Sequence, residues 1–275
     1  MNCRTISIFM IAGLMALAIP ARGQFTSDEI SEFEKWEEFL KTAEVISSEQ
    51  MGSREAVTNP WVLTLEKDGV TRKGLWKNPK GRLRGYVEGW QWEIAAYRID
   101  RLLGLNMVPP TVERRFQGDR GSIQLWMEDV ITLKDLIEDK IKMPPSKRPF
   151  LNRALYIQRT FDNLIANEDR HQNQYLITKD WRTLLIDHSR SFRTGRKFTA
   201  NLIYNEKYKS GDQLMKQLPR ILYEKIKTLT QELIKEVVGD YLTPKEIEAV
   251  MKRKKLITAW IDKRCLELGE HMVLY

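Results

Sequence analysis

Cysteine and histidine are scarce in this chain of 275 residues, which has two cysteines and three histidines. Cys3 lies near the start, so removal of the N-terminal segment would leave Cys265 as a single thiol. One thiol forms no internal disulfide, which excludes the small disulfide-stapled class of exported proteins. The histidines are too widely spaced to indicate a zinc site, and His171 is expected to brace a loop.

The chain also lacks an internal repeat, a low-complexity linker and a compact glycine-rich phosphate loop. Hydrophobic residues make up 42% of it, and eight residues are tryptophan, which is typical of a packed globular protein. A chain of this length buries a sizeable core, either as one large domain or as two lobes.

The long apolar run of this sequence lies at its start. Arg4 precedes an apolar stretch over residues 6–19, and the small residues Ala21 and Gly23 follow it. This pattern predicts a signal peptide over residues 1–23, cleaved before Gln24, and export to the periplasm or the exterior. An uncleaved anchor is the alternative, although the run is short for a membrane span, which needs roughly 20 apolar residues.

The first half of the remaining chain is predicted to be rich in strands. Lys67-Asp68-Gly69 between two apolar segments indicates a hairpin. A helix capped by Ser27 is expected within residues 24–52, and Gly104 is expected to end a second helix. The expected segments are hairpin strands at 61–66 and 70–76, a loop at 78–85, a helix at 90–103, extended chain at 108–112, a turn at 118–121 and a strand at 122–127.

The second half is predicted to be mainly helical. Thr132 and Asp135 resemble a capping pair, and Thr243-Pro-Lys-Glu is a capping box with proline at the first helical position. Helices are also expected over residues 150–166 and 219–238. A strand-rich half joined to a helix-rich half predicts a two-lobed α+β protein. The predicted lobes are residues 53–130 and 131–275.

Residues 161–192 carry the most informative pattern of polar groups. An Asp-Arg-His triplet begins at Asp169, the amides of Asn173 and Gln174 follow, and Asp187 ends an apolar stretch. Phosphoryl transfer from a nucleotide needs one carboxylate that takes the proton of the acceptor hydroxyl, and a second carboxylate with an amide that hold the metal. A hairpin between these residues would bring both carboxylates to one cleft. The alternative interpretation is a charged loop followed by a buried strand.

Four segments of the chain, in this order, resemble the secretory-pathway Golgi casein kinase (Fam20-like) family. The chain is more distantly similar to the phosphatidylinositol 3-/4-kinases and the HipA-type kinases. The resemblance implies a protein-kinase-like fold with a strand-rich N-lobe and a helical C-lobe. The segments are 93–112, 121–122, 162–171 and 186–187, within a similar region of about residues 61–192.

The resemblance also implies roles for individual residues. Asp169 matches the catalytic aspartate, and Asp187 matches the metal-binding aspartate that opens the activation segment. Glu93 matches the acidic residue of the N-lobe helix, which pairs with the nucleotide-binding lysine and approaches the metal. Lys77 is the candidate for that lysine, and the competing candidates are Lys73 and Lys80.

The adenine-binding segment of the family falls at residues 124–128, where Gln124, Trp126 and Met127 would offer backbone groups to the nucleotide. Two features of the site depart from ordinary kinases. Gln174 occupies the position of their metal-binding asparagine, with Asn173 one residue earlier, and His188-Ser189 replaces Phe-Gly. Either amide oxygen can ligate Mg or Mn, which prefer oxygen donors.

The sequence therefore predicts an exported atypical kinase that transfers the γ-phosphoryl of ATP to a hydroxyl, with protein as the expected acceptor. ATP and GTP are not distinguished. One alternative is a catalytically silent, kinase-like binding module, and another is a lipid or sugar kinase on the same fold. Basic residues of the C-terminal helices predict a solvated helix surface, with an acidic substrate or an anionic surface as the alternative partner. A nucleic-acid partner is not expected, because the aromatic residues do not alternate with the basic ones.

Overall fold

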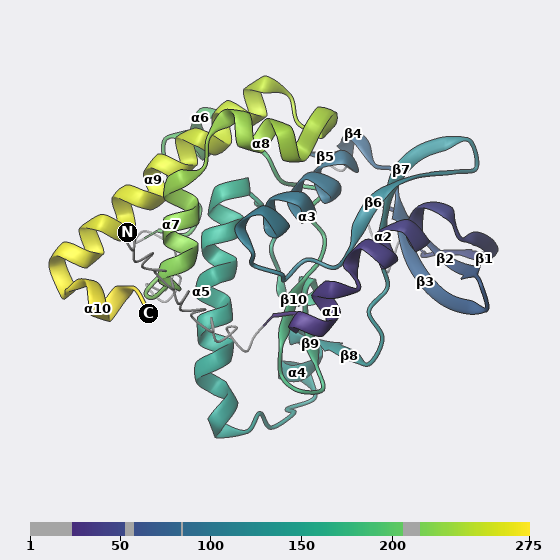
Figure 1. The fold of residues 1–275 in the computed structure, drawn as a ribbon, viewed down its shortest axis with the longest axis horizontal. Coiled ribbons are helices and arrows are strands. Elements are labelled where there is room, and N and C mark those ends of the chain that lie inside the picture. The colour runs from purple at the N-terminus through teal and green to yellow at the C-terminus, as the bar shows by residue number, and fades with distance from the viewer. Residues whose placement is uncertain (1–23, 53–57, 84, 206–214) are drawn as a thin grey trace, which may run out of the picture.

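The computed structural model describes residues 24–52, 58–83, 85–205 and 215–275, and it has the expected two parts (Figure 1). A strand-rich N-terminal part stands beside a helical C-terminal part, which confirms the α+β class. The predicted signal peptide, residues 1–23, lies outside the described residues. Within the described ranges, none of the helices combines the length and the apolar character that a membrane crossing needs.

A five-stranded antiparallel sheet forms the centre of the N-terminal part. Its strand order is β1-β2-β3-β7-β6. The turn between β2 and β3 places Asp68 and Gly69 at positive φ angles of 51° and 75°, as the sequence predicted for this hairpin. The strands are β1 (Glu44–Gln50), β2 (Trp61–Lys67), β3 (Val70–Lys77), β6 (Thr111–Phe116) and β7 (Asp119–Leu125).

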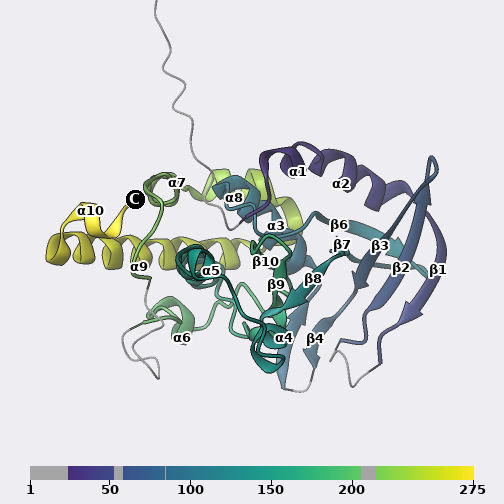
Figure 2. The ribbon, with the colours of Figure 1, turned by 90° about the horizontal axis from the view of Figure 1, so that it is seen from below.

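Two N-terminal helices, α1 (Ser27–Ser31) and α2 (Phe33–Thr42), lie along this sheet (Figure 2). Leu40 of α2 is fully buried in a core cluster that also contains sheet residues such as Leu63 and Ile123. The predicted cap, Ser27, is wrong by one residue. Thr26 is the cap, because Glu29 stands three residues after it and completes a capping box.

Helix α3 (Gln91–Leu103) lies between the sheet and the C-terminal part, and Gly104 ends it in the left-handed conformation (φ 68°) as expected. The predicted loop over residues 78–85 is wrong. This region contributes to a small hairpin made of β4 (Lys80–Leu83) and β5 (Tyr86–Gly89). The Gly89 N–H donates to the carbonyl of Ser189 (3.0 Å), so a contact distant in sequence holds the hairpin in place.

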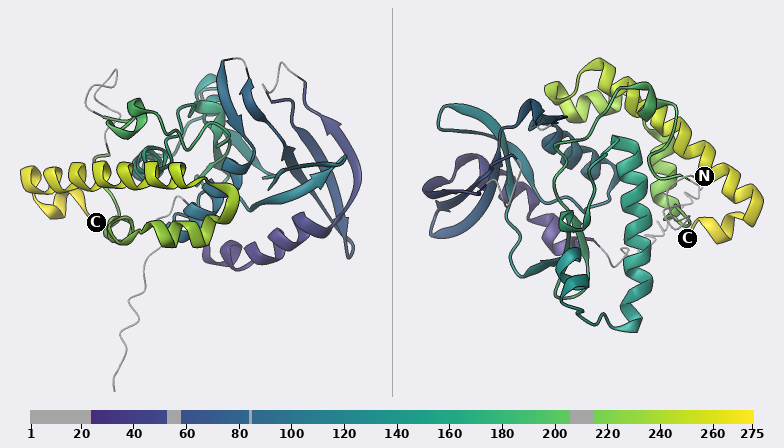
Figure 3. Two further views of the ribbon diagram at one scale, coloured as in Figure 1. Left: turned by 90° about the horizontal axis from the view of Figure 1, so that it is seen from above. Right: turned by 180° about the vertical axis from the view of Figure 1, so that it is seen from behind.

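The C-terminal part combines a three-stranded sheet, ordered β10-β9-β8, with a layer of helices (Figure 3). Helices α5 and α9 pack against each other at its core, where Phe161, Leu164 and Ile257 are buried. The elements are β8 (Val130–Thr132), β9 (Tyr175–Thr178), β10 (Thr183–Leu185), α4 (Leu133–Glu138), α5 (Arg148–Ile165), α6 (Arg196–Thr199), α7 (Arg220–Thr228), α8 (Gln231–Val238), α9 (Pro244–Leu268), α10 (Glu270–Val273) and the 3-10 turns η1 (Pro145–Lys147), η2 (Gln172–Gln174) and η3 (Gly239–Tyr241).

Several element boundaries differ from the prediction. The N-terminal helical segment expected within residues 24–52 ends at Thr42, and Glu44–Gln50 form strand β1. The helix expected over residues 219–238 is interrupted, because Leu229 has extended backbone (ψ 135°) and Thr230 caps a new helix by accepting from the Leu233 N–H. The strand expected from Ser122 begins at Asp119, since the chain already reverses at Gln117 and Gly118, which both have positive φ.

Candidate active site

Lys77 connects the two parts of the molecule. It ends β3, is only 8% exposed, and its Nζ donates to Glu93 Oε1 (2.9 Å) and to Asp187 Oδ1 (3.0 Å). Burial alone would lower the pKa of the Lys77 ammonium, but the charges of Asp187 and Glu93 outweigh burial and raise that pKa. Lys73 and Lys80, the competing candidates, are exposed.

Glu93 lies in the first turn of α3 and is also buried. Its Oε1 accepts from Lys77, and its Oε2 accepts from the backbone N–H of His188 (2.8 Å). Burial would raise the pKa of Glu93, but the Lys77 charge and the contacts with His188 lower it. Glu93 is therefore a charged group that fixes both Lys77 and the residue after Asp187.

Asp187 follows β10 and has a left-handed backbone (φ 60°), which costs energy for a residue other than glycine and is common at functional sites. Its Oδ1 accepts from Lys77 and from Ser189 Oγ (3.1 Å), and its Oδ2 accepts from Gln174 Nε2 (3.3 Å). Burial would raise the pKa of Asp187, but Lys77 holds it well below its usual range. The side chain is 37% exposed, so a ligand can reach it.

Asp169 lies in the loop after α5, where its backbone N–H donates to Asn167 Oδ1 (3.1 Å). Its Oδ1 contacts Arg190 Nη1 (2.9 Å), and its side chain is 34% exposed. Burial raises the pKa of Asp169, and Asp187 adds to that effect while Arg190 opposes it. The contact with Arg190 shows that the β9–β10 hairpin returns the chain to the vicinity of Asp169.

Arg170 braces this loop. Its guanidinium forms a fully buried bidentate pair with Asp162 (2.9 and 3.0 Å) and donates to the carbonyls of Gln174 and Ile186. His171, which was expected to brace the loop, has an exposed side chain and holds the following turn through its backbone: its N–H donates to Gln174 Oε1 (3.2 Å) and its carbonyl accepts from the Gln174 N–H (3.0 Å). A charged donor with several N–H groups is needed here, since several carbonyl and carboxylate oxygens converge on one point.

The two amide side chains that were predicted to bind the metal lie in different surroundings. Asn173 is exposed, whereas Gln174 is buried beside Asp187. The Gln174 Oε1 accepts from the His171 N–H (3.2 Å), so its NH₂ group faces Asp187 in this orientation. Among the described residues, no group of three or more His, Cys, Asp or Glu side chains is arranged to hold a metal.

The residues predicted to contact adenine lie where β7 leads into the C-terminal part. Gln124 Nε2 donates to Thr111 Oγ1 (2.8 Å), and the Trp126 N–H donates to the Lys73 carbonyl (3.0 Å). Met127 is half-buried against the larger core. The segment therefore links the two parts, although the backbone N–H of Trp126 is already bonded within the protein. The nucleotide-binding role of these residues stays a prediction.

Two residues of the site were not found from the sequence. Glu88 of β5 is 2% exposed and accepts from Ser189 Oγ (2.6 Å) and from Arg190 Nε (2.5 Å). Glu88 fell near a predicted loop, and Arg190 fell in a stretch with no regular pattern. Their pairing spans 102 positions in the chain, so no local signal could have revealed it.

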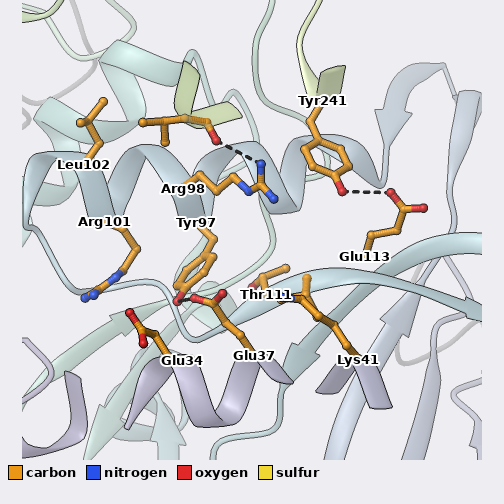
Figure 4. Close-up of a pocket in the computed structure, with 12 residues that line it drawn as sticks. Glu34, Glu37, Lys41, Tyr97, Arg98, Arg101, Leu102, Thr111, Glu113 and Tyr241 are labelled. Atoms are coloured by element: carbon orange, nitrogen blue, oxygen red, sulfur yellow. Dashed lines mark hydrogen bonds between the residues drawn. The ribbon is translucent and has the colours of Figure 1, made fainter. Parts of the chain in front are cut away.

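A separate pocket of about 470 Å³ lies between α2 and α3 (Figure 4). Tyr97 donates to Glu37 (2.6 Å) and Tyr241 donates to Glu113 (2.9 Å) at its wall. None of the candidate catalytic or metal-binding residues lines it. The pocket is therefore distinct from the site around Lys77.

Comparison with known proteins finds similar solved structures but no match by sequence. No protein-family model matches the chain, and no curated protein matches it. The structure of hydra Fam20 with sugar is similar, with 17% identity and a TM-score of 0.66 over 92% of this chain and 95% of that chain. The Golgi casein kinase is similar at 15% identity and a TM-score of 0.63, over 91% of this chain and 79% of that chain.

The Golgi casein kinase with Mn/ADP bound gives 16% identity and a TM-score of 0.63, over 91% of this chain and 80% of that chain. At these identities the similarity shows the fold alone. The similarity covers 91–92% of this chain in the three comparisons. The chain therefore has the Fam20-like kinase fold that its sequence motifs predicted.

Proposed function

We propose that this protein is an atypical kinase that transfers the γ-phosphoryl of ATP to a hydroxyl group, with protein as the expected acceptor. The observation that carries the proposal is the contact of Lys77 with both Glu93 and Asp187, which joins the sheet, α3 and the Asp187 segment. In the kinase fold this arrangement provides a cation for the nucleotide phosphates and a carboxylate for the metal.

Asp169 has the position and chemistry of the base. The acceptor oxygen forms a bond to the γ-phosphorus, the bond from that phosphorus to the β–γ bridging oxygen breaks, and the acceptor proton passes to Asp169. The raised pKa of the Asp169 carboxyl suits this step, because a base with a higher pKa takes a proton more readily. ADP leaves with the bridging oxygen.

The oxygen donors of the site fit a hard divalent cation such as Mg or Mn. Asp187 is a partly exposed carboxylate, and Gln174 Nε2 donates to its Oδ2. Such a cation is commonly bound by one or two carboxylates together with the substrate phosphates, so the lack of a larger carboxylate cluster in the described residues agrees with this mode. When bound, the metal neutralises the charge of the phosphates. The Golgi casein kinase structure with Mn and ADP supports this choice.

A second candidate function is a catalytically silent nucleotide-binding module. The observation that favours it is the Gln174 amide, whose oxygen is turned to the His171 N–H and away from Asp187. A sugar acceptor is also supported, because the hydra Fam20 structure contains a sugar. We further propose that the protein acts after export, on the basis of its N-terminal sequence pattern.

Incubation of the chain from Gln24 with γ-labelled ATP, or with labelled GTP, in the presence of Mg or Mn tests the enzyme proposal. We expect labelled phosphate on the protein itself or on casein, and no label with metal chelated. Lipid and sugar acceptors are tested in parallel. Binding of ATP and metal without transfer to any acceptor or to water would favour the silent module instead.

A further inference from the structure

Arg190 occupies an unusual place beside the candidate base. Its Nη1 contacts Asp169 Oδ1 (2.9 Å), its Nε donates to Glu88 Oε1 (2.5 Å), and its guanidinium lies 4.3 Å from the centre of the Tyr86 ring. The side chain is 11% exposed. One cation thus joins two carboxylates, one from the β4–β5 hairpin and one from the loop after α5.

Glu88 is itself held firmly. It is 2% exposed, and its second oxygen accepts from Ser189 Oγ (2.6 Å), while Ser189 also donates to Asp187 (3.1 Å). A buried carboxylate with both oxygens bonded has one allowed position, so it fixes the guanidinium that it contacts. The side chain of Asp169 is 34% exposed, and among the described residues Arg190 is the cation that contacts its Oδ1.

We propose that Arg190 is a positioning residue for Asp169 in phosphoryl transfer, and that Glu88 fixes Arg190 for this task. The Arg190 guanidinium occupies Oδ1 of Asp169 and leaves Oδ2 to face the acceptor hydroxyl. This inference rests on the proposed kinase function, because positioning a base has a consequence only if the base takes part in a reaction.

A neighbouring arginine separates this role from simple bracing. Arg193 Nε contacts Glu168 (2.6 Å) and its Nη2 donates to the Val87 carbonyl (2.7 Å). It therefore links the same hairpin to the same loop, one residue away from each partner of Arg190, but it does not contact Asp169. Arg193→Gln is the matched control, since it removes an equivalent link without touching the base.

The test compares kcat, the nucleotide KM and the melting temperature for wild type, Arg190→Gln, Arg190→Lys, Glu88→Gln and Arg193→Gln. We expect Arg190→Gln to lower kcat by about 10²-fold, the effect of displacing a catalytic group by about 1 Å, with the nucleotide KM nearly unchanged. Arg190→Lys should recover part of the loss, because an ammonium can reach one carboxylate but lacks the fork that joins two. Glu88→Gln should also lower kcat, because Glu88 fixes the position of Arg190.

Arg193→Gln should lower the melting temperature, because it also removes a link between the hairpin and the loop, yet keep the kcat of wild type. Equal kcat for wild type and folded Arg190→Gln overturns the positioning role and leaves the kinase proposal standing. If Arg190→Gln does not fold, Arg190→Lys and Glu88→Gln replace it in the test. A lower kcat in both variants supports the positioning role, and a kcat equal to that of wild type overturns it. A wild-type protein that transfers nothing overturns the kinase proposal and the positioning role together.

Discussion

At the scale of single residues, Asp169 separates an enzyme from a silent binding module. Asp169→Asn keeps the size and hydrogen-bonding reach of the side chain but removes the charge that accepts a proton. We expect turnover to fall by roughly 10²–10⁴-fold, the usual contribution of a positioned general base. The melting temperature and ATP affinity should stay close to those of wild type. Labelled-phosphate transfer, thermal melting and ATP titration on the same preparations check this.

A structural aspartate would behave differently, because its loss would weaken stability and nucleotide affinity along with any activity. Asp169→Asn that transfers phosphate as fast as wild type would refute the catalytic assignment. Asp262→Asn, at a residue that contacts Tyr223 far along the chain, is a control for the general effect of this substitution.

The proposed role of Asp169 as the base predicts that activity depends on pH in a defined direction. Burial raises this pKa above its ordinary value, Asp187 raises it further, and Arg190 and His171 lower it. The base works only as the carboxylate, so kcat should fall as the pH drops through this raised pKa. Removing Arg190 takes away a cation that favours the carboxylate, so the acidic limb of the profile should move to higher pH in Arg190→Gln. An unchanged limb would mean that a different group titrates.

At the scale of elements, the parts of the fold that were predicted depend on neighbours in sequence. The β2–β3 hairpin follows from Asp68-Gly69, and the end of α3 follows from Gly104, because glycine and aspartate permit positive φ. The break at Leu229 was missed although Thr230 is a capping residue, since the apolar spacing continues through it. The spacing of apolar residues cannot distinguish one long helix from two consecutive helices whose apolar faces point to the same core.

The candidate site was predicted where its residues belong to motifs and missed where they do not. Asp169 and Asp187 lie within one short segment, and Lys77 was chosen by its distance from Glu93. Glu88 was missed because its partners, Ser189 and Arg190, come about a hundred residues later. These contacts form because the β4–β5 hairpin packs against the C-terminal part. The spacing of hydrophobic residues along the sequence does not reveal such packing.

The close approach of β3 and β7 gives a prediction at this scale. A Cβ added at Gly121 would lie 2.5 Å from the Lys77 carbonyl oxygen and 2.7 Å from the Trp76 ring. Gly121→Ala must therefore push the strands apart, and we expect a loss of about 1–3 kcal/mol in the free energy of unfolding, as for overpacked cores. Urea unfolding measures it.

Gly52→Ala is the control for that substitution, because a Cβ at Gly52 meets nothing within 4 Å. Its free energy of unfolding should stay within about 0.5 kcal/mol of wild type. The Gly121 substitution should also weaken ATP binding, since it displaces the backbone of Lys77. Equal stability of the two variants would show that the strands do not meet as closely as described.

At the scale of the whole molecule, the site joins the two parts through charges that come from both. Lys77 is on the sheet, Glu93 on α3 and Asp187 after β10, so one buried network fixes the position of the N-terminal part on the helical part. The pKa values of Asp187 and Glu93 are lowered by this network, so its stabilising effect is present at neutral pH and is lost as the pH falls through those lowered values.

Nucleotide and metal bound together should therefore raise the free energy of unfolding of the whole protein. At one hundred times its dissociation constant, a ligand adds about 2.7 kcal/mol to the free energy of unfolding. For a chain of this size that corresponds to a rise of about 5–10 °C in melting temperature. We expect this rise with ATP and Mn together, and a much smaller one with ATP alone, since the phosphates then keep their charge.

Asp187→Ala should abolish most of that rise, because it removes the carboxylate that we propose as the metal ligand and leaves the charge of Lys77 balanced by Glu93 alone. The unliganded variant should also melt below wild type, since breaking a buried ion pair leaves a partner poorly compensated. Asp240→Ala is the control, because it removes the carboxylate of an exposed residue of η3. It should keep the full rise in melting temperature with ATP and Mn. Equal responses of wild type and Asp187→Ala to ATP and Mn would show that Asp187 does not hold the metal. The nucleotide would then have to bind away from the Lys77 network, and the kinase assignment would lose the contact on which it rests.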